Sequence, residues 1–147
     1  MIKFHTIGQI EHEYHFEDAV ASADTFNGAF GAVSTGKFTA GATATKAIMQ
    51  VEVGDDAGIP KYAIAKDSHV KVIDFTKYDG ELFDIFDYPL PASVKVGDKL
   101  QSQEDGSLHV NSDAEAILHV GSSFYLEVKE IIGNKAGVVV LVHGATA

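Results

Sequence analysis

The sequence predicts an all-β protein, a single small β-barrel or sandwich with an extended N-terminal arm. Short runs of alternating apolar and polar residues recur from residue 46 onward, and glycines punctuate them as turns. Helical periodicity is weak, and no internal repeat of the kind that builds propellers or solenoids is visible. A chain of 147 residues suits one domain with its own core.

Composition excludes several functions. The net charge is −10, and all eleven basic residues are Lys, so the side chain best suited to phosphate and base-edge contacts is absent. We therefore expect no nucleic-acid partner. The chain has no Cys, which removes disulfides, thiolate metal sites and Cys nucleophiles. No apolar run is long enough to cross a membrane and no secretion signal is visible at the start, so we expect no membrane partner.

The first 45 residues differ from the rest. Apolar and polar residues alternate over 10–17, which indicates an extended strand or arm, and residues 17–23 suggest a short helical turn. Residues 26–45 are almost all Gly, Ala, Thr and Ser, with three Phe among them. These side chains look too small to fill a core, so we expect the stretch to lie flat on a surface, its own or a partner's.

The predicted organisation is therefore an arm and small-residue surface segment over 1–45, followed by a β-barrel or sandwich over 46–147. Little local sequence can bury the aromatic rings of the first segment, so a partner surface is their expected place. Deleting residues 1–24 should then leave a folded barrel that binds its partner less well. The predicted partner-binding residues are Phe4, Tyr14, Phe16, Phe26, Phe30 and Phe38.

Short strands are predicted through the remainder of the chain. The Asp105–Gly106 pair is a typical hairpin turn between two of them. The predicted strands cover residues 49–53, 62–65, 70–75, 82–88, 98–103, 107–111, 115–120, 123–132 and 137–143.

Seven histidines raise the question of a metal site, and the densest group is His5, His12 and His15. His12 and His15 would point to opposite faces of an extended strand, so one ion could bind both only at a turn or helix. Solvated or interface histidines are the favoured interpretation, and no metal site is predicted. The other four, His69, His109, His119 and His143, stand singly in predicted strands and are interpreted as packing or edge residues.

Catalytic arrangements are equally unspecific. Ser68, Ser107, Ser122 and Ser123 could each be combined with several His and Asp residues, but no Gly-x-Ser-x-Gly elbow occurs. Asp84 and Asp87 could form a glycosidase pair, yet the chain has no Trp to bind a sugar. Turn carboxylates at Asp55, Asp56, Asp79 and Glu81 suit calcium without forming an EF-hand loop. We predict no catalytic residue and no cofactor.

One turn, residues 96–100 (VGDKL), resembles a turn of biotinyl and lipoyl carrier domains. The hairpin at residues 105–107 (DGS) offers no lysine for modification, so this interpretation carries little weight.

A second resemblance covers residues 24–143. Residues 26–28 (FNG) open the small-residue stretch, and the region 46–66 with its Gly-rich turn comes next. Residues 74–75 (DF) then lead into 78–81 (YDGE), and residues 96–100 (VGDKL) and 105–108 (DGSL) follow. In this order the motifs resemble the head decoration, or cement, proteins of tailed bacteriophages. The resemblance implies a non-enzymatic virion protein that binds the outside of the capsid and stabilises the head lattice. No residue role is carried over, because the matching positions are turn glycines and their neighbours.

The resemblance also implies the major capsid protein as partner, self-association on the lattice, and assembly in the bacterial cytoplasm. Two alternatives stay open. A tail-tube or baseplate protein would share the β-rich sequence, and a carbohydrate-binding β-sandwich would share it too, although it should show Trp or a row of exposed Tyr. A cupin-type enzyme would need a His-x-His metal motif, which is absent.

Overall fold

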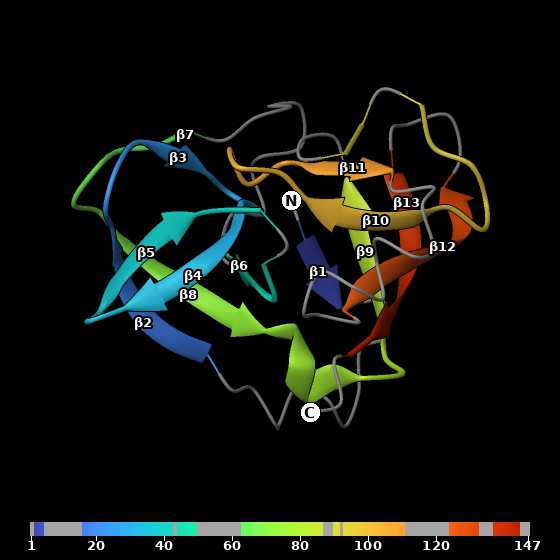
Figure 1. Cartoon of the computed structure of the whole chain (residues 1–147), viewed down its shortest axis with the longest axis horizontal. Helices are drawn as coiled ribbons and strands as arrows, with labels where there is room; N and C mark the ends of the chain where they lie inside the picture. The colour runs from blue at the N-terminus through green and yellow to red at the C-terminus, as the bar shows by residue number, and fades with distance from the viewer. Residues whose placement is uncertain are drawn as a thin grey trace.

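The described part of the computed structural model consists entirely of strands, turns and one short 3-10 helix (Figure 1). No α-helix occurs in these residues, so the all-β prediction is confirmed. The structure describes residues 2–4, 16–42, 44–49, 63–86, 90–91, 93–110, 124–132 and 137–144.

Five strands close into a small barrel, seen on the left of Figure 1. Their order around the barrel is β2-β5-β4-β6-β8, and the only parallel pairing among them joins β2 to β5. A two-stranded sheet of β3 (Thr25–Phe26) and β7 (Ala63–Ile64) lies beside it. The barrel strands are β2 (Phe16–Ala21), β4 (Phe30–Ser34), β5 (Lys37–Ala40), β6 (Lys46–Ile48) and β8 (His69–Asp74).

Small residues allow this barrel to close. A barrel of five strands has a narrow interior, since the diameter grows with strand number. One buried cluster brings together small and large side chains from the barrel strands, the β3–β7 pair and the turn before β4: Ala19, Ala21, Phe26, Ala29, Phe38, Ile48, Ile64, Val70 and Val72. Gly31 is required where β4 meets β5, because a Cβ there would overlap the Thr39 carbonyl oxygen and lie 2.7 Å from the Phe38 ring.

The second unit is a six-stranded antiparallel sheet, seen on the right of Figure 1. Its order is β1-β9-β13-β12-β10-β11. The register of β12 against β13 shifts between Val128 and Glu130, which marks a bulge. The strands are β1 (Ile2–Phe4), β9 (Leu82–Phe86), β10 (Lys99–Ser102), β11 (Leu108–Val110), β12 (Tyr125–Ile132) and β13 (Gly137–His143).

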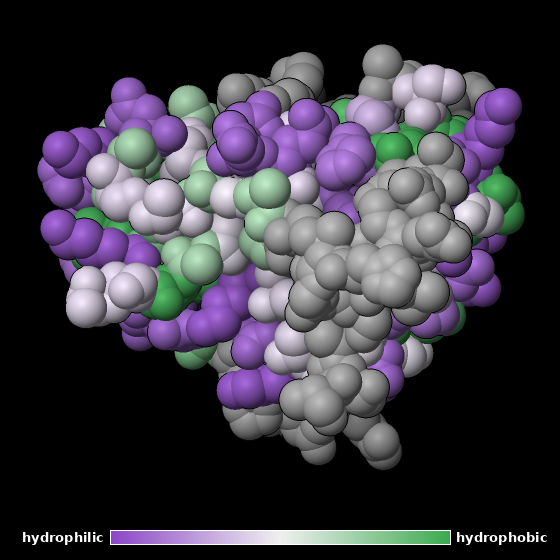
Figure 2. Space-filling model, viewed as in Figure 1, coloured by the Kyte–Doolittle hydropathy of each residue, from purple (hydrophilic) through white to green (hydrophobic). Residues whose placement is uncertain are grey.

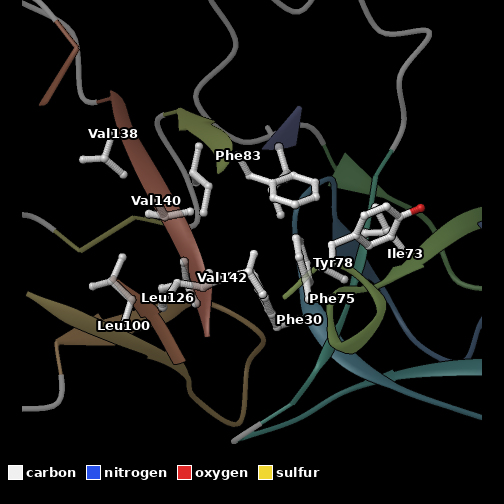
Figure 3. Packing of buried hydrophobic residues seen from close by; sticks show 14 of the residues in the cluster. Phe30, Ile73, Phe75, Tyr78, Phe83, Leu100, Leu126, Val138, Val140 and Val142 are labelled. Atoms are coloured by element: carbon white, nitrogen blue, oxygen red, sulfur yellow. The ribbon is translucent and has the colours of Figure 1, made fainter. Parts of the chain in front are cut away.

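One hydrophobic core joins the barrel to the sheet (Figure 3). On β6 and just after it, Ala47 and Met49 belong to this shared core, whereas Ile48 belongs to the barrel cluster. This alternation is what a strand buried on both faces requires. At the junction the rings of Phe30 and Phe75 stack with centroids 5.5 Å apart, and Phe83 meets Phe75 edge-on at 4.9 Å. The two units therefore share this core, and the barrel has a second buried cluster of its own.

The predicted Asp105–Gly106 hairpin is confirmed, and its tip contacts the barrel. The Asp105 carboxylate accepts hydrogen bonds from the backbone N–H and the hydroxyl of Ser107, at 2.9 and 2.6 Å. The Gly106 carbonyl accepts a hydrogen bond from the N–H of Phe30 at 2.9 Å. Behind the tip, Ser102 donates its hydroxyl to the Gly41 carbonyl at 2.9 Å. The hairpin therefore ties the sheet to β4 and to the end of β5.

The predicted surface segment needs correction. Residues 17–23, expected to form a helical turn, belong mainly to β2, which pairs with β8. Residues 26–40 contain the end of β3, all of β4 and all of β5, and β4 pairs with β6 across the predicted boundary at residue 45. Strands from both sides of that boundary thus close one barrel. Residues 5–15, which belong to the predicted N-terminal arm, lie outside the described residues.

Candidate functional site

The predicted aromatic binding surface is not a surface at three of its six residues. Phe26, Phe30 and Phe38 are 3%, 0% and 1% exposed. Phe26 and Phe38 pack in the barrel cluster and Phe30 in the shared core. The prediction that these three rings contact a partner is therefore wrong, because the closed barrel itself buries them.

The other three residues fare differently. Phe16 begins β2, is partly buried and packs against the shared core. The backbone of Phe4 lies in β1 opposite Phe83. Tyr14 lies outside the described residues. The structure thus does not assemble the predicted set into one patch.

The candidate metal and catalytic residues lie at several different places in the described structure. No group of three His, Asp or Glu side chains with metal-binding geometry occurs within the described ranges. His69 is exposed on β8, and Asp84 is buried on β9. Ser107 is engaged with Asp105 in the hairpin turn. The following candidates lie outside the described residues: His5, His12, His15, Asp55, Asp56, Asp87, His119, Ser122 and Ser123.

The best-defined group of polar side chains spans β10, β12 and β13. We call it the outer-face cluster; it consists of Lys99, Tyr125, Glu127, Lys129 and His143. The Tyr125 and His143 rings stack with centroids 4.4 Å apart, and the Lys99 Nζ lies 5.0 Å from the Tyr125 centroid. Glu127 Oε2 lies 2.9 Å from both Lys129 Nζ and His143 Nε2.

Strand register brings the outer-face cluster together. Tyr125 lies opposite His143 in the β12–β13 pair, and Glu127 lies opposite Lys99 in the β10–β12 pair. Residues two apart on a strand share a face, so Tyr125 and Glu127 point the same way. From the sequence, His143 is interpreted as a packing or edge residue that stands singly in a strand. The Tyr-x-Glu-x-Lys alternation over 125–129 was the available signal, but its partners depend on register.

The electrostatics of this cluster favour an ionised Glu127. Hydrogen bonds from Lys129 and then from His143 lower the pKa of Glu127 from its ordinary value of 4.5, and partial burial opposes them less strongly. A carboxylate with a lowered pKa is a weaker base at neutral pH, which is the opposite of what general-base catalysis needs. Because the Glu127 side chain is still 25% exposed, its ion pair with Lys129 is worth at most about 1 kcal/mol. The arrangement can join three strands and present half-exposed rings; it has no feature that activates a nucleophile.

A hollow of about 290 Å³ lies beside β4, between this strand and residues 41–42 and 44–46. Its lining includes Gly31, Ala32, Val33, Ala42, Ala44 and Lys46. Lys46 pairs with Glu17 at 2.9 Å, so its ammonium group is already engaged. Small-molecule sites usually begin near this volume and combine apolar walls with convergent polar groups. This hollow offers mostly small aliphatic side chains.

The carboxylates of several turns have structural roles. Asp74 accepts the N–H of Thr76 at the start of the 3-10 helix η2 (Phe75–Tyr78), and Asp79 accepts the N–H of Gly144 at 2.8 Å. Asp98 accepts the N–H of Lys95, and Asp24 that of Lys66, each at 2.8 Å. These acidic residues satisfy backbone donors at bends between strands.

On the face shown in Figure 2, the described surface mixes hydrophilic residues with small hydrophobic patches. Among the described residues, Val96 and Ile131 are the large hydrophobic side chains classed as exposed. No helix in these residues has the length and apolar character needed to span a membrane. No protein-family model, curated protein or solved structure matches this chain.

Proposed function

We propose that this chain is a structural virion protein that binds the outside of a bacteriophage capsid and stabilises the head lattice. The sequence resemblance to head decoration proteins is the origin of the proposal. The turns on which that resemblance depends are formed in the structure: Gly80, Gly97 and Gly106 all adopt positive φ at bends.

The observation that carries the proposal is that acidic side chains form hydrogen bonds to the chain's own backbone at turns. Asp24, Asp74, Asp79, Asp98 and Asp105 each accept a backbone hydrogen bond at a turn. Glu127 Oε2 lies 2.9 Å from both Lys129 Nζ and His143 Nε2, so neighbouring side chains hold it in place. A fold whose acidic side chains stabilise its own turns through hydrogen bonds is suited to a structural role under mechanical load. The net charge of −10 keeps such a protein soluble before it binds.

Linkage explains how a small protein stabilises a large particle. A protein that binds only the assembled lattice shifts assembly by about 2.7 kcal/mol per site when its free concentration is 100 times its Kd. Many equivalent sites on one particle multiply this effect. Modest affinity at each site is therefore sufficient.

The test compares particles that carry the protein with particles made without it. Decorated particles should release their DNA at higher temperature, and adding the purified protein to bare particles should restore that temperature. A matched control adds the heat-unfolded and cooled protein after verifying that it has lost its fold. Equal DNA release with and without the native protein, at verified full occupancy, would contradict the stabilising role.

Averaged particle images distinguish the alternatives. Density for the chain on the head exterior supports the proposal. Density along the tail tube or in the baseplate would instead assign the chain to the tail, which shares a β-rich sequence.

A further inference from the structure

Asn27 and Gly28 form an Asn-Gly pair, a sequence in which Asn is prone to deamidation. In an unfolded chain, the backbone nitrogen of a residue after Asn can attack the Asn side-chain amide. Gly permits this attack best, because it has no Cβ in the way and its backbone adopts the required conformations freely. An Asn-Gly pair is therefore a site of spontaneous deamidation unless the fold prevents it.

The folded barrel buries this pair and restrains its backbone. Asn27 is 3% exposed, and Gly28 is buried with φ +92°. The Gly28 N–H, which must lose its proton before the attack, donates to the Ile48 carbonyl of β6 at 3.1 Å. One residue later, Ala29 accepts the Ile48 N–H at 2.9 Å. The nucleophilic nitrogen is thus both engaged and fixed in place.

A second attachment lies just beyond. The Phe30 N–H donates to the Gly106 carbonyl at the tip of the β10–β11 hairpin. The turn that contains Asn27 and Gly28 is therefore fastened to β6 on one side and to the hairpin on the other. The turn can leave β6 only if at least the hydrogen bond from the Gly28 N–H to the Ile48 carbonyl breaks.

We propose that Asn27–Gly28 is a latent deamidation site that barrel closure protects, so that modification occurs only in molecules whose β3–β4 turn has opened. In the open state, solvent base removes the Gly28 amide proton, and the nitrogen forms a bond to Asn27 Cγ. The Cγ–Nδ2 bond breaks, and ammonia leaves with protons from water. Water then opens the five-membered imide at either carbonyl and yields aspartate or isoaspartate at position 27. The net change is addition of water and loss of ammonia, without oxidation or reduction.

With aspartate or isoaspartate at position 27, the closed conformation is less stable than it is with Asn27. A carboxylate would replace a neutral amide at a position that is 3% exposed, beside the buried Phe26 and Ala29. The isoaspartate form also lengthens the backbone by one carbon within a tight turn. Opening followed by modification therefore removes a molecule from the native population irreversibly.

The first test measures deamidation at Asn27 in the intact folded chain and in a synthetic peptide of residues 24–31, in the same buffer at neutral pH. Peptide mapping by mass spectrometry locates the modification, and isoaspartyl methyltransferase detects the isoaspartate. The folded chain should react at least about tenfold more slowly, since local opening has a free-energy cost. In the folded chain, exchange of the Gly28 amide hydrogen with solvent should be slower than in the peptide by a similar factor. Equal rates in protein and peptide would overturn the proposal.

A pair of variants tests whether opening of this turn controls the rate. In Gly106→Ala the new Cβ would lie 2.9 Å from the Phe30 carbonyl oxygen and 3.1 Å from Ala29 Cβ, directly beyond the Asn-Gly pair. In Gly97→Ala, at a similar positive φ, the new Cβ meets no atom within 4 Å. Deamidation should be about tenfold faster in Gly106→Ala than in Gly97→Ala. Equal rates in the two variants would show that the turn is not the controlling element.

Discussion

Gly106→Ala is the sharpest test of how the sheet is fastened to the barrel. Gly106 has φ +86°, a conformation that costs an L-residue about 1–2 kcal/mol. Its new Cβ would also approach the Phe30 carbonyl oxygen at 2.9 Å, Ala29 Cβ at 3.1 Å and Ala40 Cβ at 3.2 Å. Overpacking of this kind costs about 1–3 kcal/mol. The change should therefore lower the free energy of unfolding by about 2–5 kcal/mol.

Gly97→Ala is the matched control. Gly97 has φ +94°, but a Cβ there meets nothing within 4 Å. The control should lose only the conformational part, about 1–2 kcal/mol. Equilibrium unfolding in urea measures both variants, and the midpoint should fall further for Gly106→Ala without a change in slope. If the two variants differ by less than about 0.5 kcal/mol, the range of ordinary surface substitutions, the hairpin tip does not fasten the barrel as inferred.

Three further outcomes are expected. Phe30→Ala should lower the free energy of unfolding in urea by about 3–5 kcal/mol, because the Phe30 ring is fully buried and stacked. Phe16→Ala, at a partly buried position, should lower it by less than half as much, and equal losses would contradict the assigned burial. Glu127 has a lowered pKa, so its stabilisation is present above pH 4.5 and is lost as pH falls through the folded-state pKa; Glu127→Gln should flatten the stability profile in that acidic range, and parallel profiles would exclude the contribution. Deleting residues 1–24 removes β1 and β2, so the barrel cannot close and cooperative thermal unfolding should disappear; a truncated chain that still unfolds cooperatively would show that β2 is dispensable.

Local pattern was sufficient to locate most of the described strands after residue 46. The run predicted over 137–143 coincides with β13, and those over 82–88 and 98–103 contain β9 and β10. Alternation and turn glycines are properties of a few consecutive residues, so they can be read without knowing the fold. The hairpin at Asp105–Gly106 was predictable for the same reason, and the structure adds that its tip contacts Phe30.

The small-residue segment could not be understood in the same way. From the sequence, Ala and Gly side chains are predicted to be too small to fill a core, and the three Phe rings are predicted to contact a partner. A five-stranded barrel reverses both conclusions, since its narrow interior needs small residues and still accommodates Phe26 and Phe38. The outer-face cluster was also unpredictable, because Lys99, Tyr125 and His143 meet only through the register of three strands.

The sequence by itself determined an acidic, all-β chain, the positions of many strands and the turns between them, because each depends on neighbouring residues and on composition. Tertiary structure alone decided which strands pair and which side chains are buried. The parallel pairing of β2 with β5 closes the barrel, and the contact of Phe30 with Phe75 joins it to the sheet. Such contacts link residues far apart in the chain, and their free energy is realised only when the whole barrel has closed.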